Sequence, residues 1–397
     1  MSPSTDQMDP LLPTYDRLPV QFDRGEGVYL HDDEGNRYLD ALAGIAVNIL
    51  GYRHPVLLET AHEALGDIHH LSNLFEIPSQ RRLAQKLSEL TFGTRAFFCN
   101  SGAEAIEGAI KFCRKYSYRF GNDGRKIITA RNSFHGRSLG ALTATGQTKY
   151  QEGFEPLPGG FEHVPFNDPE ALEEAMDDQV CGVLLEPIQG EGGVVPAESS
   201  YLNRARELCD EYGSLMVVDE IQSGMGRTGE FLAVGNHEIQ PDVVTLAKGL
   251  GGGFPIGAFL VDETLESGLQ SGDHASTFGG NPFVTKVSCA VLEILEAEGL
   301  MGCSRERGRE IEEELQRLSE EIEKVRAPRG EGLMLGLPLE PPLDAGDVLE
   351  EALEEDLLVG TAGENTVRLV PPLILTESEA GELLERLEAA LRSTMEG

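Results

Sequence analysis

Five short apolar segments in the middle of the chain constrain its fold more than any other feature of the sequence. They are TRAFFCN (94–100), KIITAR (126–131), CGVLLEP (181–187), SLMVVDE (214–220) and DVVTLAK (242–248). Longer segments with helical periodicity lie between them, for example 104–118 and 201–211. Apolar runs of this length that alternate with helices are typical of parallel strands covered on both faces. The sequence therefore predicts an α/β fold.

The chain beyond about residue 300 is shorter and more acidic, and it predicts a smaller α+β domain. A helix is predicted over 308–326, because apolar residues recur there every three or four positions. These residues are Ile311, Leu315, Leu318, Ile322 and Val325. The acidic residues on the other face of this helix are expected to form a solvated surface.

The acidity of the whole chain excludes several classes of partner. The 32 Lys and Arg residues face 68 Asp and Glu residues, which gives a formal net charge of −36. A nucleic-acid binder is not expected, because it needs a basic surface to neutralise phosphates. Docking on an anionic membrane is disfavoured for the same reason. Since only 8 of the 32 cations are Lys, we interpret the composition as halophilic, suited to a salt-rich cytoplasm in which screening makes this charge tolerable.

The cysteines and the N-terminal segment indicate a cytoplasmic protein. The six cysteines show no paired spacing, as expected for free thiols in a reducing compartment. The first twenty residues lack the apolar stretch of a signal peptide, and no apolar run approaches the roughly 18 residues of a membrane helix. His62 and Glu63 lack a second histidine at Gly66, so no zinc helix is expected. No metal site is predicted.

A chemically capable residue or turn follows each of the five apolar segments. These are Ser101–Gly102–Ala103, Phe134–His135–Gly136–Arg137, Glu186, Asp219 and Lys248. Ligands of open α/β sheets bind at the carboxyl ends of the strands. We therefore expect these residues to surround a single site.

Lys248 and Asp219 are the two strongest of these candidates. Lys248 lies between an apolar strand and a glycine-rich turn, where burial would lower the pKa of its amine and make it a nucleophile. The alternative is a lysine whose head reaches solvent at a strand end. Asp219 ends a buried strand and would be either a structural cap or ion pair, or a fixed anion that holds a proton on a heterocyclic nitrogen.

The turn 101–103 and Phe134 complete the pattern. The turn connects a strand to a helix, so its amides and the helix dipole could hold a phosphate, although many such turns have no ligand. Phe134 could stack on a flat ring or belong to the core. A lysine, an aspartate, a phosphate turn and an aromatic residue together indicate pyridoxal 5′-phosphate (PLP).

Eight blocks of this sequence, in the same order, resemble the class III (ornithine-type) aminotransferases of PLP fold type I. The blocks are LDALAGIAVNILGYRHP (39–55), FFCNSGAEA (97–105), FHGRSLGAL (134–142), LLEPIQGEGG (184–193), VVDEIQSGMGRTG (217–229), LAKGLGGGFPIGA (246–258), GDHASTFGGNP (272–282) and VRLVPPL (367–373). The resemblance covers nearly the whole chain. It implies a mainly parallel seven-stranded sheet with helices on both faces. It also implies an N-terminal segment (1–50) that packs with the small domain, a large PLP-binding domain (51–300) and a small C-terminal domain (301–397).

The resemblance also implies roles for the residues at the cofactor. Lys248 would form the Schiff base, Asp219 would pair with the pyridine nitrogen, and Gln222 would lie near the phenolic oxygen. Thr277 would reach the phosphate bound in the neighbouring subunit, which makes the active unit a homodimer. The other implied cofactor contacts are Ser101, Gly102, Ala103, Phe134 and Glu186.

The implied substrate contacts are two arginines and a glutamate. Arg137 resembles the arginine that binds the α-carboxylate of the amino donor, and Arg368 resembles the one that binds the α-carboxylate of 2-oxoglutarate or glutamate. Glu191 resembles the residue that neutralises Arg368 while the larger donor is bound. Such an acid allows the arginine to be masked without leaving a buried charge unpaired.

The implied reaction is the transfer of the terminal amine of N-acetylornithine to 2-oxoglutarate, which gives N-acetylglutamate semialdehyde and glutamate, in arginine biosynthesis. An alternative donor is lysine or ornithine bound to an acidic carrier protein, in lysine or arginine biosynthesis. That partner would need a basic rim, for which Arg81, Arg82 and Arg95 are candidates. 4-Aminobutyrate or ornithine aminotransferase, an aminomutase and a non-catalytic protein of this fold remain further alternatives.

Overall fold

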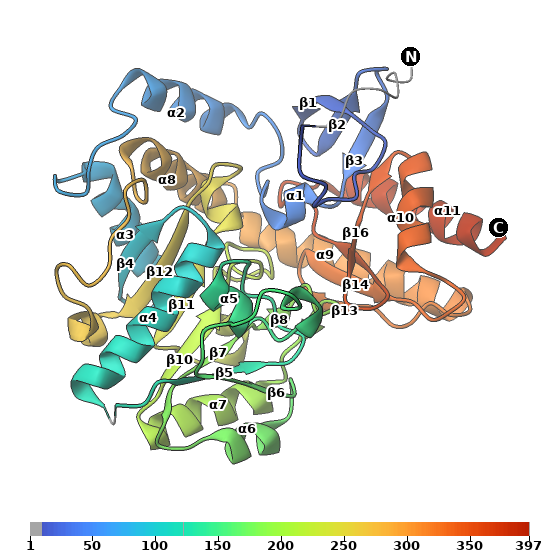
Figure 1. The fold of residues 1–397 in the computed structure, drawn as a ribbon. Helices are drawn as coiled ribbons and strands as arrows, with labels where there is room; N and C mark the ends of the chain where they lie inside the picture. Colours follow the sequence, from blue (N-terminus) through green and yellow to red (C-terminus); the bar gives the residue numbers. More distant parts are fainter. Residues whose placement is uncertain (1–9, 122, 397) are drawn as a thin grey trace.

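The computed structural model describes residues 10–121 and 123–396, and Figure 1 shows their arrangement. The first nine residues of the predicted N-terminal segment therefore lie outside the described residues. Among those described, no helix has both the length and the apolar character that crossing a bilayer requires.

A seven-stranded sheet forms the centre of the larger part of the molecule. Its strands, in spatial order, are β4 (Thr94–Cys99), β12 (Gly257–Asp262), β11 (Val243–Leu246), β10 (Leu215–Asp219), β7 (Val180–Leu185), β5 (Lys126–Ala130) and β6 (Phe161–Val164). Strand β12 pairs antiparallel with β11 and β4, and the other pairs are parallel. The predicted mainly parallel sheet is confirmed, and all five apolar segments contribute a strand to it.

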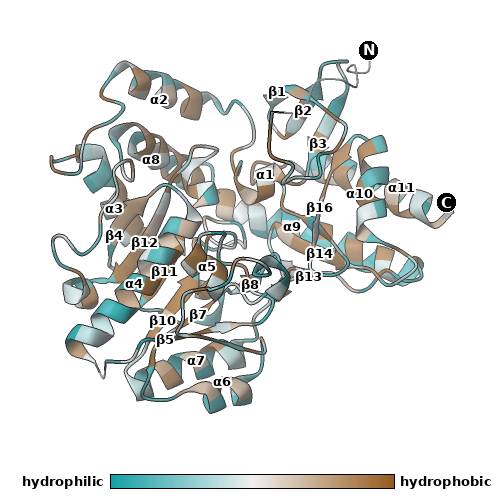
Figure 2. Ribbon diagram, in the orientation of Figure 1, coloured by the Kyte–Doolittle hydropathy of each residue, from teal (hydrophilic) through white to brown (hydrophobic). Residues whose placement is uncertain are grey.

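Helices cover both faces of this sheet because its strands are apolar on both sides. Val217 of β10 packs in a cluster with α4 (Gly102–Phe120), whereas Met216 and Val218 pack in the cluster that contains α7 (Ser199–Tyr212). Neighbouring residues of a strand point to opposite faces, so the two helices lie on opposite sides. Figure 2 shows the resulting hydrophobic strands and the outer helices with mixed surfaces. Burial on both faces leaves the strand ends as the places where polar side chains can gather.

The N-terminal strands join the C-terminal part of the chain. Strands β1 (Phe22–Glu26), β2 (Tyr29–Asp32) and β3 (Arg37–Asp40) form an antiparallel ribbon, and β3 pairs with β15 (Leu357–Leu358). A second sheet has the order β13 (Arg329–Glu331), β14 (Met334–Pro338), β17 (Thr366–Leu369) and β16 (Gly360–Ala362), with antiparallel pairs throughout. The exact limits of the domains stay predictions.

The predicted helix 308–326 differs from the observed one at both ends. Helix α9 begins at Leu300 and ends at Glu321. Ile322 and Val325 are buried as the pattern predicts, but they follow the helix, and Val325 forms a bridge with Leu339. The apolar spacing continued past the helix because the next segment packs on the same core.

Further helices and one short hairpin complete these two parts. The helices are α1 (Ala43–Ala46), α2 (Pro55–Gly66), α3 (Pro78–Leu90), α5 (Leu139–Ala144), α6 (Pro169–Ala175), α8 (Pro282–Ala297), α10 (Ala345–Glu354) and α11 (Glu377–Glu396), and the short strands β8 (Ile188–Gln189) and β9 (Val195–Pro196) form a hairpin.

Candidate active site

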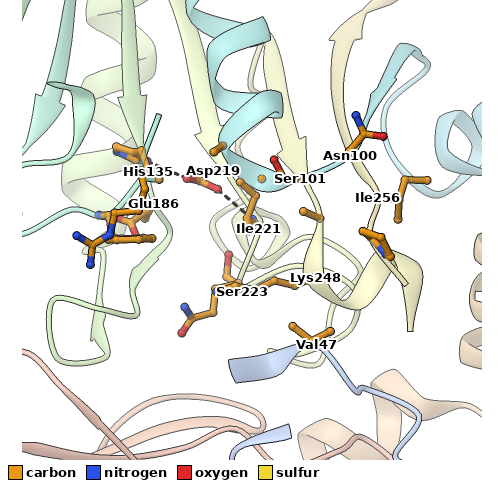
Figure 3. Close-up of a pocket in the computed structure, with 18 of the residues that line it drawn as sticks. Val47, Asn100, Ser101, His135, Glu186, Asp219, Ile221, Ser223, Lys248 and Ile256 are labelled. Atoms are coloured by element: carbon orange, nitrogen blue, oxygen red, sulfur yellow. Dashed lines mark hydrogen bonds and ion pairs between the residues drawn. The ribbon is translucent and has the colours of Figure 1, made fainter. Parts of the chain in front are cut away.

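A cavity of about 470 Å³ lies where the carboxyl ends of the central strands meet. Figure 3 shows the side chains that surround it. The predicted residues that line this cavity are Ser101, Gly102, Ala103, Phe134, Arg137, Glu186, Asp219, Gln222 and Lys248. Each of the five apolar segments thus brings its following residue to the same place, as the alternation of strands and helices predicts.

Asp219 is held as a fixed acceptor at the end of β10. Its Oδ1 accepts hydrogen bonds from the N–H of Ile221 at 3.0 Å and the hydroxyl of Thr245 at 3.1 Å. Its Oδ2 lies 2.8 Å from Nδ1 of the buried His135, and an ionised carboxylate can only accept there, which places a proton on Nδ1. Figure 3 shows two of these contacts as dashed lines. Three donors from three segments therefore stabilise a negative charge that faces the cavity.

Lys248 follows β11 as the first residue of a 3₁₀ turn (Lys248–Gly251) and has a positive φ of 42°. It is partly exposed, toward the cavity that it lines. Burial lowers the pKa of its amine to about 8, although Glu191 opposes this change. The unprotonated fraction of the amine near neutral pH is therefore larger than for an ordinary lysine, which favours a role as nucleophile or base.

Glu186 differs from Asp219 although both carboxyls line the cavity. Burial, and next the charge of Asp219, raise the pKa of Glu186 well above its usual value. Its Oε2 accepts a hydrogen bond from the N–H of Phe134 at 3.3 Å. Burial thus favours the neutral form of Glu186.

The start of α4 forms one wall of the cavity. Ser101 caps this helix, and its Oγ accepts a hydrogen bond from the N–H of Glu104 at 3.3 Å. The amides of Gly102 and Ala103 lie in the first turn, where the helix itself offers no acceptor. A Cβ at Gly102 would lie 2.9 Å from Cδ1 of Ile221, so this close approach favours glycine. The wall presents free amide donors and the positive end of a helix dipole.

Arg137 and Phe134 lie on another wall of the cavity, and Tyr150 packs against both of them. The guanidinium carbon of Arg137 lies 3.9 Å from the ring centroid of Tyr150 and 5.6 Å from that of Phe134. The rings of Phe134 and Tyr150 meet edge to face at 6.0 Å. The two rings hold a cation at the cavity wall without neutralising it, which leaves Arg137 able to bind a carboxylate.

Arg368, Glu191 and Gln222 form one hydrogen-bonded group. Arg368 is 3% exposed, pairs with Glu191 and donates to Oε1 of Gln222 at 3.3 Å, and Nε2 of Gln222 donates to Glu191 at 3.3 Å. Burial would raise the pKa of Glu191, but the charges of Arg368 and Lys248 outweigh this effect and lower it. The pair is therefore ionised, and Gln222 connects it to the cavity that Lys248 lines.

Thr277 does not lie in this cavity. It lines a separate hollow together with Asn73, Leu74 and Ser276. Within one protomer the structure thus separates Thr277 from the other predicted cofactor contacts.

The residues present fit pyridoxal 5′-phosphate. The cavity combines an amine of lowered pKa on Lys248, a fixed carboxylate on Asp219, an aromatic ring on Phe134 and free amides at the start of α4. The Nε2 atom of His135 is buried without a hydrogen-bond partner, so this imidazole is committed to Asp219. In the described ranges, no group of three or more His, Cys, Asp or Glu side chains is arranged to hold a metal ion.

Three supporting residues were not assigned a role by sequence reasoning. The sequence indicates His135 only as a neighbour of Phe134, and Thr245 only as part of an apolar strand. Tyr150 lies in a 3₁₀ turn (Thr148–Tyr150) far from any predicted motif. Thr245 carried a usable signal, because it is a polar residue between the valines and Leu246 of a buried strand.

Comparisons with known proteins agree with this geometry. The family model for class-III aminotransferases matches residues 12–391. The acetylornithine aminotransferase of Caldanaerobacter subterraneus subsp. tengcongensis is 48% identical over 382 residues, which cover 96% of this chain and 97% of the relative. The N-acetylornithine aminotransferase structure from Stenotrophomonas maltophilia K279a is 39% identical, with a TM-score of 0.85, and the match covers 96% of this chain and 98% of that chain. The ornithine aminotransferase structure from Toxoplasma gondii ME49 is 32% identical, with a TM-score of 0.94, and covers 97% and 93%.

Proposed function

The chain belongs to the class-III aminotransferases, and from this premise we propose that it transfers the terminal amine of N-acetylornithine to 2-oxoglutarate. It is a PLP-dependent transaminase. The observation that carries the choice of reaction is the ionised Glu191–Arg368 pair next to Lys248. An enzyme that takes two substrates into one pocket needs such a pair. Arg368 must bind a carboxylate in one half-reaction and must be neutralised in the other.

Lys248 and Asp219 carry the chemistry in this proposal. When bound, PLP supplies an electron sink for the carbanion that forms at the substrate carbon. Nζ of Lys248 removes the proton from that carbon and returns it at the other end of the reacting system, a general acid–base role. Asp219 holds the proton on the ring nitrogen. Its three donors from the protein hold it in a fixed orientation for this task.

The two arginines divide the substrates between them. Arg137 would bind the α-carboxylate of N-acetylornithine, since its cation is exposed and held only by aromatic rings. Arg368 would bind the α-carboxylate of 2-oxoglutarate after Glu191 releases it. A bidentate arginine contact fixes a carboxylate in one orientation. Glu191 thus acts as the switch between the two half-reactions.

The contacts of three arginines bear on the carrier-bound alternative. Arg81, Arg82 and Arg95 each pair with at least one glutamate, and they are absent from the residues that line the cavity. Neutralised cations do not form a basic rim that attracts an acidic partner. This supports a free amino donor over one bound to a carrier protein.

The first prediction is that free N-acetylornithine is the preferred donor. With PLP and 2-oxoglutarate present, we expect its kcat/KM to exceed that of ornithine or 4-aminobutyrate by at least about tenfold, a typical discrimination for a change of a few groups. The measurement is glutamate formed from 2-oxoglutarate in concentrated KCl. Equal rates with all three donors would contradict the substrate assignment.

Two further measurements distinguish the remaining alternatives. Activity with carrier-bound lysine or ornithine alone would move the enzyme to the carrier-dependent pathway. Product formation without stoichiometric use of 2-oxoglutarate would indicate an aminomutase, which has no need of the Glu191–Arg368 switch.

We also propose that the active unit is a homodimer. Thr277 lies outside the cavity of its own protomer, as expected if it serves the neighbouring one. Leu74, which lines the same hollow, is 89% exposed, and the adjacent Phe278 is 61% exposed. Exposed apolar side chains of this size favour coverage by another protein surface.

The second prediction concerns salt, and it follows from the net charge of −36. Screening weakens the repulsion among surface carboxylates. We expect the melting temperature to rise by roughly 5 °C or more between low and multimolar KCl, which is a few kcal/mol for a chain of this size. Thermal melts and sedimentation velocity at both concentrations check the stability and the dimer together. Equal melting temperatures would contradict the halophilic interpretation, and a monomer in both buffers would contradict the dimer.

A further inference from the structure

The segment that carries Glu191 is fastened to the small β13–β14–β17–β16 sheet. In the turn between β16 and β17, the N–H of Gly363 donates to the carbonyl oxygen of Glu191 at 3.0 Å. On β13, Nε of Arg329 donates to the carbonyl oxygen of Gly193 at 2.8 Å. Arg368 lies on β17 of the same sheet. Both members of the Glu191–Arg368 pair therefore take their positions from one sheet.

The contact between this segment and the sheet is close and strained. A Cβ at Gly363, where φ is +62°, would lie 2.9 Å from Cα of Gly193 and 3.0 Å from the carbonyl oxygen of Gly192. Val194 has a φ of 56°, which is unfavourable for a β-branched residue. Such a conformation persists only where the surroundings impose it. The contacts from the sheet thus determine the path of residues 190–194.

Among the residues that the structure describes, Arg329 has no acidic partner for its charge. Besides Gly193 it donates from Nη2 to Oγ1 of Thr366 at 3.3 Å, and burial lowers its pKa. None of the ion pairs among the described residues includes it, in contrast to the nearby Arg326, which pairs with Glu340. The half-buried guanidinium of Arg329 donates to a carbonyl and a hydroxyl. It therefore orients the backbone and does not neutralise an acidic group.

Arg329 also lines a second cavity, of about 880 Å³, and Glu191 lines the same cavity. Loss of its guanidinium would leave the 190–194 segment next to open space and without its hydrogen bond at Gly193. The Glu191 carboxylate would then be held on Arg368 less firmly, since its backbone would be less restrained.

We propose that Arg329 is a positioning residue that sets the balance between the two substrates of this enzyme. By holding the carbonyl of Gly193 it keeps Glu191 on Arg368. This rests on the proposed function, in which Arg368 must be masked for the longer donor and free for 2-oxoglutarate. If Glu191 pairs less firmly with Arg368, binding of 2-oxoglutarate is favoured and binding of the amino donor is disfavoured.

The test compares the two half-reactions of the holoenzyme in single turnovers, followed by the cofactor absorbance. Arg329→Met keeps the length of the side chain and removes its donors. We expect the ratio of kcat/KM for 2-oxoglutarate to that for N-acetylornithine to rise about tenfold, mainly through KM, as typical for a coupling between two sites. Arg329→Lys should restore part of the wild-type ratio. Arg326→Met is the matched control and should leave the ratio unchanged.

Gly363→Ala provides a second route to the same segment, because its added Cβ would push on Gly192 and Gly193. It should raise the ratio in the same direction, so the test does not depend on the folding of one variant. An unchanged ratio in both variants, or an equal loss in both half-reactions, would overturn the proposal. A wild-type protein that reacts with neither substrate would instead overturn the proposed function.

Discussion

Replacement of Lys248 by alanine should lower kcat by about 10⁴-fold or more, the upper end of what a positioned base contributes. The amine of Lys248 has a pKa of about 8 and faces the cavity. The two neighbouring acids cannot replace it. Burial raises the pKa of Glu186 and favours its neutral form, and Asp219 is committed to three donors. The measurement is glutamate formation from 2-oxoglutarate at saturating donor.

Two comparisons make this result specific. Lys286→Ala removes a lysine that pairs with Asp67 at the surface, and it should keep its activity. In the wild type, kcat should fall as the pH drops below about 8, because Lys248 then holds a proton and cannot accept one. A Lys248→Ala variant with measurable turnover and the usual spectral changes would refute the assignment.

The strands at the centre of the fold were predictable because burial on both faces demands continuous apolar sequence. β4, β5, β10 and β11 lie within predicted segments, and β7 begins one residue before its segment. Strands β6 and β12 were not predicted. The former is only four residues long and contains Glu162 and His163, and the latter follows directly on the glycine-rich turn after Lys248. Short edge strands and strands next to turns lack a distinct pattern of their own.

The positions of the candidate residues followed from the strands, but their interactions did not. Because Asp219 and Lys248 each come at the end of a predicted strand, they were expected to lie together, and both line the same cavity. The bond from His135 to Asp219 joins residues 84 positions apart, and the Glu191–Arg368 pair joins residues 177 positions apart. No periodicity in one sequence encodes such contacts. The second pair was expected only through the family resemblance, and the contacts of Arg329 with Gly193 and Thr366 became visible only in the structure.

Asp219→Asn should reduce kcat by about 10³-fold while leaving the fold intact. Loss of one preorganised electrostatic contact in an active site lowers kcat by about 10²–10³-fold, because each 1.36 kcal/mol of lost transition-state stabilisation is a factor of ten in rate. Asparagine keeps an oxygen for Ile221 and Thr245, but it offers His135 an amide donor in place of an acceptor. His135 would then need its other tautomer, which puts a proton on a buried Nε2 that has no partner. The variant thus loses both the charge and its support.

The matched control is Asp242→Asn. Asp242 precedes β11, at the opposite end of the sheet from the cavity, and its carboxylate accepts from the N–H of Met216 and from Arg206, both at 2.7 Å. Its substitution should lower the melting temperature without a selective effect on the half-reactions, whereas Asp219→Asn should slow both half-reactions and change the melting temperature less. If Asp219→Asn retained a near wild-type kcat in single turnovers, the proton on the ring nitrogen would not depend on this carboxylate. Glu191 could not take over this role, because it is already paired with Arg368.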